Sequence, residues 1–210
     1  MLPFRPQAVV FDLDGVLVDS EDVWARAEAR TVEELGGSYG REVAELLYGR
    51  GHRDGGRLLA ERFGGDADAI GERLLDLALA GMREGLRPLP GAVELVTSLR
   101  GRVPIAVASN SVRAIVETAL AAAGLAASFD AVVCGEDVER AKPAPDAYLA
   151  ACGALGADPT RTVALDDSPV GVASAKAAGL FTIGVDSGRG VPLPDADVVL
   201  SSLAELDLAA

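Results

Sequence analysis

The chain has 210 residues, half of them hydrophobic, which is enough for one large α/β domain or for a core domain with a smaller insertion. Only 4% of the residues are aromatic, so we expect a core of Ala, Val and Leu, as in helices packed on a parallel sheet. The formal net charge is −13, and so acidic a surface repels the phosphates of nucleic acids and of anionic lipids, which excludes both as expected partners.

The first predicted strand covers residues 7–11, a short apolar run that ends at Asp12. About 70 residues without a strand pattern follow it. Helical periodicity with Gly-rich breaks marks four helices there, at 20–35, 41–48, 54–63 and 68–84. We therefore predict a four-helix insertion at 17–87, and a core domain made of 1–16 and 88–210.

Strand and helix patterns alternate through the rest of the chain. Strands are predicted at 103–108, 131–134, 162–165, 181–185 and, more weakly, 197–200. Helices are predicted at 92–99, 112–123, 147–155 and 170–178, with a short final helix within 201–210. This alternation indicates right-handed βαβ crossovers and an α/β fold with a doubly wound, Rossmann-like, mainly parallel sheet.

Two carboxylates stand at the end of the first strand. Asp12 and Asp14 are two residues apart, so they point the same way from an extended segment, and Gly15 allows a sharp turn beside them. Such a pair suits a hard cation, and it allows one carboxylate to attack while the other transfers a proton. A solvated strand end with helix-capping acids is the alternative interpretation.

Polar residues also follow three later strands, where doubly wound sheets bind their ligands. The sequence Ser109-Asn110-Ser111 opens a helix and suits a phosphate oxygen or a plain N-cap. Lys142 is a point charge suited to phosphate, or a solvated loop lysine. Asp166 and Asp167 are adjacent acids that repel each other unless a cation or a proton offsets them.

These four motifs resemble those of the haloacid dehalogenase superfamily. The resemblance lies in FDLDGVLVDSE (11–21), SNS (109–111), AKPAPDAY (141–148) and LDDSPVGVASAKAAG (165–179). It covers nearly the whole predicted core, and the helical insertion matches the small cap of that superfamily. The likeness is greatest to its subfamily I group of sugar phosphatases, phosphoglycolate phosphatases and β-phosphoglucomutases.

The resemblance implies a role for each motif. Asp12 would be the nucleophile and a Mg²⁺ ligand, and Asp14 the general acid and base that also lends its carbonyl to the metal. Ser109 and Lys142 would bind the transferring phosphoryl group, with help from Asn110. Asp167 would ligate Mg²⁺ directly, and Asp166 would support it directly or through water. Many relatives carry Glu at this place, and the shorter Asp favours the water-mediated role.

The expected activity is that of a Mg²⁺-dependent phosphoric monoester hydrolase acting on a small phosphorylated metabolite, such as a sugar phosphate or phosphoglycolate, through an aspartyl-phosphate. A phosphomutase of the β-phosphoglucomutase type is the alternative, because the core motifs are the same in both. Asp14 argues against dehalogenation, since a halide leaving group needs no acid. A non-catalytic scaffold on this fold would not need both acid pairs.

The insertion is expected to close over the cleft and to choose the substrate. Its candidate contacts are Glu21, Trp24, Arg50, His52 and Arg53. The basic loop at 49–53 suits a substrate hydroxyl, carboxylate or second phosphate, or else it is a solvated turn. Trp24 is interpreted as packing rather than stacking on a ligand.

The remaining features concern the compartment and the assembly. Cys134 and Cys152 lack CxxC spacing, so we predict reduced, partly buried thiols rather than a zinc site or a disulfide. No stretch approaches the ~20 apolar residues of a membrane span, and no signal-peptide pattern is present. The expectation is a cytoplasmic protein that is a monomer or weak dimer.

Overall fold

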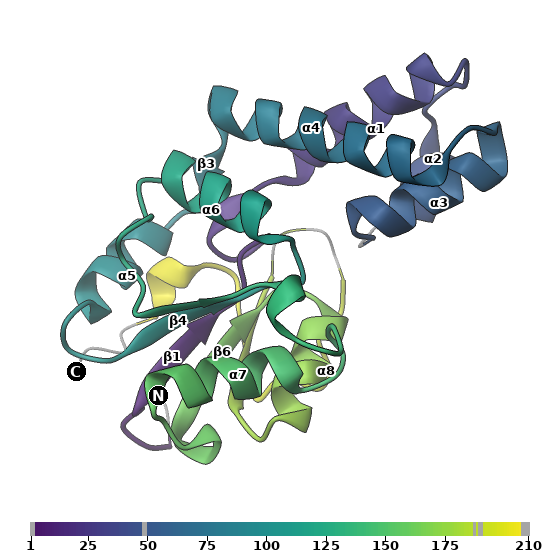
Figure 1. Cartoon of the computed structure of the whole chain (residues 1–210). Coiled ribbons are helices and arrows are strands. Elements are labelled where there is room, and N and C mark those ends of the chain that lie inside the picture. The colour runs from purple at the N-terminus through teal and green to yellow at the C-terminus, as the bar shows by residue number, and fades with distance from the viewer. Residues whose placement is uncertain (1–2, 48–49, 187, 189–190, 207–210) are drawn as a thin grey trace. The chain divides into compact units, whose positions relative to one another are not determined.

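The computed structural model describes residues 3–47, 50–186, 188 and 191–206, and Figure 1 labels the main helices and strands of each part. The chain divides into two compact units, Met1–Asp19 with Arg87–Ala210, and Ser20–Leu86. Each unit has its own hydrophobic core. None of the helices in the described ranges combines the length and the apolar composition needed to cross a bilayer.

The larger unit contains a six-stranded sheet in the order β5-β4-β1-β6-β7-β8, in which all neighbouring strands are parallel. The strands are β1 (Ala8–Phe11), β4 (Ile105–Ala108), β5 (Ala131–Val133), β6 (Thr162–Asp166), β7 (Phe181–Val185) and β8 (Val198–Leu200). Each lies within or close to a run that the sequence predicts as strand. The predicted α/β fold class is confirmed.

Helices cover both faces of this sheet. The helices α5 (Ala92–Leu99) and α6 (Arg113–Ala122) lie on one face, and α7 (Asp146–Leu155) and α8 (Pro169–Ala177) lie on the other (Figure 1). The strand order runs outward from β1 through β4 to β5, and in the opposite direction from β6 through β7 to β8. The carboxyl ends of β1 and β6 therefore border the switch point, where sheets of this topology bind ligands.

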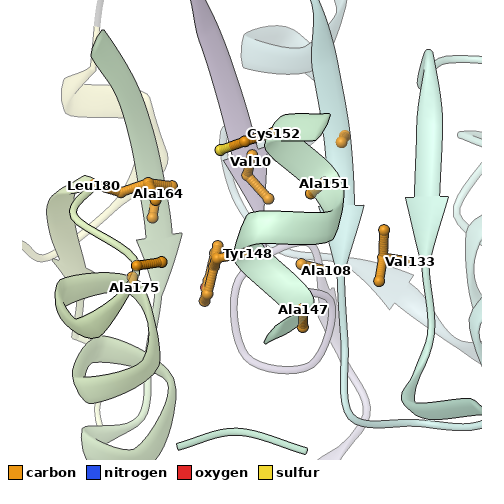
Figure 2. Close-up of a cluster of buried hydrophobic side chains, with 12 residues drawn as sticks. Val10, Ala108, Val133, Ala147, Tyr148, Ala151, Cys152, Ala164, Ala175 and Leu180 are labelled. Atoms are coloured by element: carbon orange, nitrogen blue, oxygen red, sulfur yellow. The ribbon is translucent and has the colours of Figure 1, made fainter. Parts of the chain in front are cut away.

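Small side chains fill the layer between the sheet and helices α7 and α8. The buried members of this cluster are Val10, Ala106, Ala108, Val133, Ala147, Tyr148, Ala151, Cys152, Ala164, Ala175, Ala178 and Leu180. Most of these residues are Ala or Val, as the composition predicts. Alanine side chains are small enough for the helices to pack closely on the sheet. Tyr148 is the exception in size, and its side chain lies between α7 and the strands that carry Val10 and Ala164 (Figure 2).

The smaller unit is helical. It comprises α1 (Glu21–Glu34), α2 (Arg41–Leu47), α3 (His52–Phe63) and α4 (Ala67–Gly85). Its core consists of Val32, Val43, Leu47, Leu59, Ile70 and Leu74. Asp66 is the N-cap of α4, and its carboxylate accepts a hydrogen bond from the Ala69 amide at 2.9 Å. All four helices lie close to the ranges that their periodicity predicts.

Two features differ from the sequence-based expectations. The strands β2 (Val18–Asp19) and β3 (Arg87–Pro88) pair antiparallel, so the chain leaves and re-enters the larger unit through adjacent segments. Strands of two residues are too short to produce a readable pattern. Near the C-terminus, a short 3₁₀ turn, η3 (Leu203–Glu205), stands where a final helix was predicted, and residues 207–210 lie outside the described ranges.

Candidate active site

The loop after β1 carries the first pair of acids. The Asp12 amide donates a hydrogen bond to the Leu165 carbonyl at 2.8 Å, so the chain is still held against β6 as it leaves the strand. Gly15 has a positive φ of 77°. A Cβ at Gly15 would collide with the Asp167 carboxylate, so this glycine is needed both for the turn and for the close approach of residue 167.

The second pair of acids stands at the end of β6. Asp166 is the last residue of that strand and is buried, and Asp167 follows it, also buried. Carboxylate oxygens of Asp12, Asp166 and Asp167 lie within 4.8 Å of one another. Clustered carboxylate oxygens are the donor set of a hard divalent cation. A buried acidic cluster able to hold a metal ion is therefore present, at the predicted place.

Lys142 brings a positive charge into this cluster. Its ammonium Nζ lies 2.7 Å from Asp12 Oδ1 and 2.8 Å from Asp166 Oδ2, and its side chain is only 4% exposed. Lys142 is therefore a buried, ion-paired residue and not a solvated loop lysine. Among the described residues, this places a cation and the candidate nucleophile in direct contact across 130 residues of sequence.

The segment after β4 contributes hydroxyl and amide groups. Ser109 is buried, and its Oγ accepts a hydrogen bond from the Ser111 amide at 3.0 Å. Ser111 Oγ in turn donates to Asp14 Oδ2 at 3.1 Å. The Asn110 side chain holds the backbone of Lys142, accepting from its amide at 2.9 Å and donating to its carbonyl at 3.3 Å. The Asn110 amide thus positions the lysine loop.

The charges of these groups do not balance. Burial raises the pKa of Asp12 well above its ordinary value; Lys142 lowers it, while Asp166, Asp14 and Asp167 raise it further. Burial alone would lower the pKa of Lys142, but Asp12 and Asp166 outweigh this effect and raise it well above its ordinary value. Four carboxylates face one ammonium here, so the site favours an additional cation.

Two further side chains in or beside the motifs belong to this site through contacts that the sequence does not predict. The Tyr148 hydroxyl lies 2.7 Å from Asp166 Oδ2, and burial, followed by the charge of Asp166, raises the pKa of the phenol well above its ordinary value. Ser111 is the second, through its bond to Asp14. Tyr148 stands at the end of the AKPAPDAY motif, which is the only sequence signal that could have found it.

Of the candidate substrate contacts in the helical unit, some line a cavity and others do not. A small cavity within that unit is lined by Trp24, Glu28, Leu47, Arg50, Gly51, His52, Gly55 and Leu74. Arg50 and His52 therefore share a cavity with Trp24. Arg53 and Glu21 lie on the exposed surface of α3 and α1 and do not line it.

Comparison with known proteins agrees with this geometry. Residues 6–179 match the family model of haloacid dehalogenase-like hydrolases. The chain is 32% identical to a validoxylamine A 7′-phosphate phosphatase of Streptomyces hygroscopicus subsp. limoneus, with 95% of each protein covered. It is 33% identical to hexitol phosphatase B of Escherichia coli K12, over 97% of this chain and 96% of the relative. The fructose-1-phosphate phosphatase YqaB of the same strain is 32% identical, over 86% and 97%.

Solved structures agree as well. CbbY from Rhodobacter sphaeroides in complex with phosphate superposes with a TM-score of 0.84 at 31% identity, covering 95% of this chain and 96% of the other. A mutant of the same CbbY in complex with xylulose-(1,5)bisphosphate gives 0.85 at 31% identity, covering 96% of each. The resemblance read from the four motifs is thereby confirmed: this chain belongs to the haloacid dehalogenase-like hydrolase family.

Proposed function

We propose that this protein is a Mg²⁺-dependent phosphatase that hydrolyses a small phosphorylated carbohydrate through an aspartyl-phosphate on Asp12. The observation that carries the proposal is the contact of 2.7 Å between the Lys142 ammonium and Asp12 Oδ1, beside a second carboxylate pair. Relatives at 32–33% identity are named as phosphatases of fructose 1-phosphate, hexitols and validoxylamine A 7′-phosphate, which supports the same substrate class.

In the first step, an Asp12 carboxylate oxygen attacks the phosphorus, and the bond from phosphorus to the ester oxygen breaks. Asp14 gives its proton to that oxygen, so the sugar leaves as a neutral alcohol. In the second step, Asp14 takes a proton from a water molecule that attacks the same phosphorus. Asp12 is released as a carboxylate, and inorganic phosphate is formed.

The phosphoryl oxygens need positive charge and hydrogen-bond donors, because they approach a cluster of carboxylates. We assign the binding of the phosphoryl oxygens to the Lys142 ammonium and the Ser109 hydroxyl, because both residues are buried. Asn110 contributes by holding the Lys142 backbone through its side-chain amide. Binding of the phosphate and activation of the nucleophile then depend on the same lysine.

The donor chemistry of the site fits Mg²⁺, which prefers a few carboxylates and retains several waters. Carboxylates of Asp12 and Asp167 and the main-chain carbonyl of Asp14 would hold it, with Asp167 brought close by the missing Cβ of Gly15. When bound, Mg²⁺ would supply positive charge against the developing charge of the phosphoryl oxygens.

We further propose that the unit Ser20–Leu86 is the cap that selects the substrate. Arg50 and His52 line its cavity together with Glu28, a combination of charged and hydrogen-bonding groups suited to sugar hydroxyls. Arg50→Ala should therefore change the order of preference among sugar phosphates, and Arg53→Ala, on the exposed surface, is the matched control. An unchanged preference in Arg50→Ala would remove Arg50 from this role.

The decisive experiment combines a substrate screen with one substitution. Purified protein with Mg²⁺ should release inorganic phosphate from hexose or hexitol phosphates, and an acid-quenched reaction should contain phosphoenzyme. Asp12→Asn should abolish both signals, because an amide oxygen cannot form the acyl phosphate. Full activity in that variant would contradict the proposal. Formation of an isomeric sugar phosphate without phosphate release would indicate the phosphomutase instead.

A further inference from the structure

Tyr148 places a phenol among charged groups in the core of the larger unit. It is fully buried, and among the described residues it is the bulkiest of the fully buried side chains. Its ring packs in the layer between α7 and the sheet (Figure 2). A buried hydroxyl needs a partner, and this one donates to Asp166 Oδ2 at 2.7 Å, a charge-assisted hydrogen bond.

The carboxylate of Asp166 receives four donors from the protein. Its Oδ2 accepts from the Tyr148 hydroxyl at 2.7 Å and from Lys142 Nζ at 2.8 Å. Its Oδ1 accepts from the Ser168 amide at 3.0 Å and from the Ser168 hydroxyl at 2.8 Å. A carboxylate offers about four lone-pair sites, so these donors occupy all of them. A bond from Asp166 to a metal ion would have to displace one of the four.

The Asp166 carboxylate also packs against the first turn of helix α8. A Cβ at Gly171, in the first turn of that helix, would collide with the Asp166 carboxylate. Ser168 caps the same turn, with its Oγ accepting from the Gly171 amide at 3.0 Å. The carboxylate is therefore seated against the helix start, and its orientation is fixed on both oxygens.

Lys142 depends on these neighbours for its direction. An ammonium on a four-carbon chain has no preferred orientation of its own and takes it from its partners. Here Nζ contacts Asp12 Oδ1, Asp166 Oδ2 and, at 3.4 Å, the Tyr148 hydroxyl. The same Nζ lies 4.7 Å from the centre of the Tyr148 ring, a distance that allows a cation–π contact.

We propose that Tyr148 is a positioning residue: its hydroxyl fixes the Asp166 carboxylate, which directs the Lys142 ammonium at Asp12, and Asp166 serves the lysine rather than coordinating the metal ion. The inference rests on the proposed function, since it assigns a role within that reaction. It separates the two adjacent acids by task, with Asp167 facing the cation and Asp166 facing the lysine.

Tyr148→Phe tests the positioning role of Tyr148, because it keeps the ring and removes only the hydroxyl. Loss of one charge-assisted hydrogen bond should lower kcat by about tenfold, with KM changed by less than about twofold. The inhibition constant of orthovanadate, a mimic of the transferring phosphoryl group, should weaken by about the same factor. A merely structural role would reduce the fraction of active protein without changing the vanadate constant, and that result would overturn the proposal.

NMR provides a signature independent of activity. Lys142 and Lys176 are the two lysines of the chain, so ¹⁵N-lysine labelling gives two ammonium signals, assigned by Lys176→Gln. The buried Lys142 signal should shift and exchange faster in Tyr148→Phe, while that of Lys176, paired with Asp197 on the surface, should not change. If that variant does not fold, the wild-type protein still decides. A slowly exchanging Tyr148 hydroxyl proton close to the Lys142 ammonium supports the proposal, and its absence overturns it.

Metal affinity tests whether Asp166 is a ligand of the metal ion. With Mn²⁺ alone as the probe, followed by EPR, Asp166→Asn should bind within about threefold of the wild type, whereas Asp167→Asn should lose more than about tenfold. Equal losses would make Asp166 a ligand and overturn this part. Asp12→Asn distinguishes failure of the positioning role from failure of the proposed function. If it is inactive while Tyr148→Phe behaves as wild type, only the positioning role fails; if it is active, the proposed function itself fails.

Discussion

Ser111 Oγ donates a hydrogen bond to Asp14 Oδ2 at 3.1 Å, joining two loops that are 97 residues apart in the sequence. The bond connects the segment after β4 to the segment after β1. In the proposed reaction Asp14 gives a proton to the leaving oxygen, so the direction of its carboxyl group matters for the rate. In that reaction the third residue of the Ser109–Ser111 segment would support the acid, while the first would bind the phosphoryl group.

Ser111→Ala should lower kcat/KM according to the leaving group. An alkoxide needs protonation and p-nitrophenolate does not, so we expect a loss of about tenfold with a sugar phosphate and of less than about threefold with p-nitrophenyl phosphate. Steady-state kinetics with both substrates measure the difference. Ser111→Thr keeps the hydroxyl and is the control. Equal losses with the two substrates would contradict a role through Asp14.

The positions of Asp12, Lys142 and Asp167 could be predicted because each directly follows a recognisable strand or lies in a recognisable motif. In a parallel sheet the carboxyl ends of the strands meet at one edge, so order in the sequence is enough to bring such residues together. Apolar runs located β1 and β6, and helical periodicity located the four helices of the smaller unit.

The partners of the side chains could not be predicted in this way. Tyr148 follows a helical pattern and reads as an ordinary core residue, because its acceptor, Asp166, comes from a different strand. Asn110 was expected to bind phosphate, since an amide suits an anion as well as it suits a peptide backbone. Only the tertiary structure shows that its amide is occupied by the backbone of Lys142.

Removal of divalent cations should silence the enzyme. Four carboxylates face one ammonium, and a phosphoryl group adds further negative charge, so without a cation the nucleophile and the substrate repel each other. EDTA should reduce phosphate release to background, and excess Mg²⁺ should restore it. In Asp167→Asn the Mg²⁺ concentration for half-maximal rate should rise by at least about tenfold. Undiminished turnover in EDTA would rule out a metal-dependent reaction.

The buried thiol of Cys134 should be unreactive in the native protein. Burial raises its pKa to about 11, an effect that Arg113 opposes and that Asp137 and Glu136 reinforce. The thiolate is the reactive form, and at pH 8 it amounts to about one part in a thousand at this pKa. Ellman's reagent should therefore label native protein slowly and unfolded protein rapidly. Cys134→Ser, which retains Cys152, shows which thiol reacts.

The same shift has a consequence for stability. Because the pKa of Cys134 is higher in the folded than in the unfolded chain, the protonated thiol stabilises the fold at pH below 9.0. That contribution is lost as the pH rises toward 11. The free energy of unfolding should therefore fall over this interval, and less so in Cys134→Ser. Denaturant titrations at pH 8 and 10.5 measure the difference, and an identical decline in both proteins would contradict it.

Close packing of α3 against α4 depends on Gly56. A Cβ there would meet the Ala67 carbonyl oxygen and the backbone of Gly71, and backbone atoms cannot move aside as a flexible side chain can. Gly56→Ala should therefore destabilise the helical unit by about 1–3 kcal/mol, although alanine favours helices by up to about 1 kcal/mol over glycine. Circular dichroism during denaturant unfolding measures the change, and hydrogen exchange in α3 and α4 locates it.

Gly85, the exposed last residue of α4, is the matched control in the same unit, because a Cβ there would meet no neighbouring atom. Gly85→Ala should leave stability unchanged or raise it by about 0.5 kcal/mol through helix propensity alone. The sign of the effect thus separates packing from propensity. If Gly56→Ala is as stable as Gly85→Ala, helices α3 and α4 can move apart at little cost, and their close contact does not require glycine.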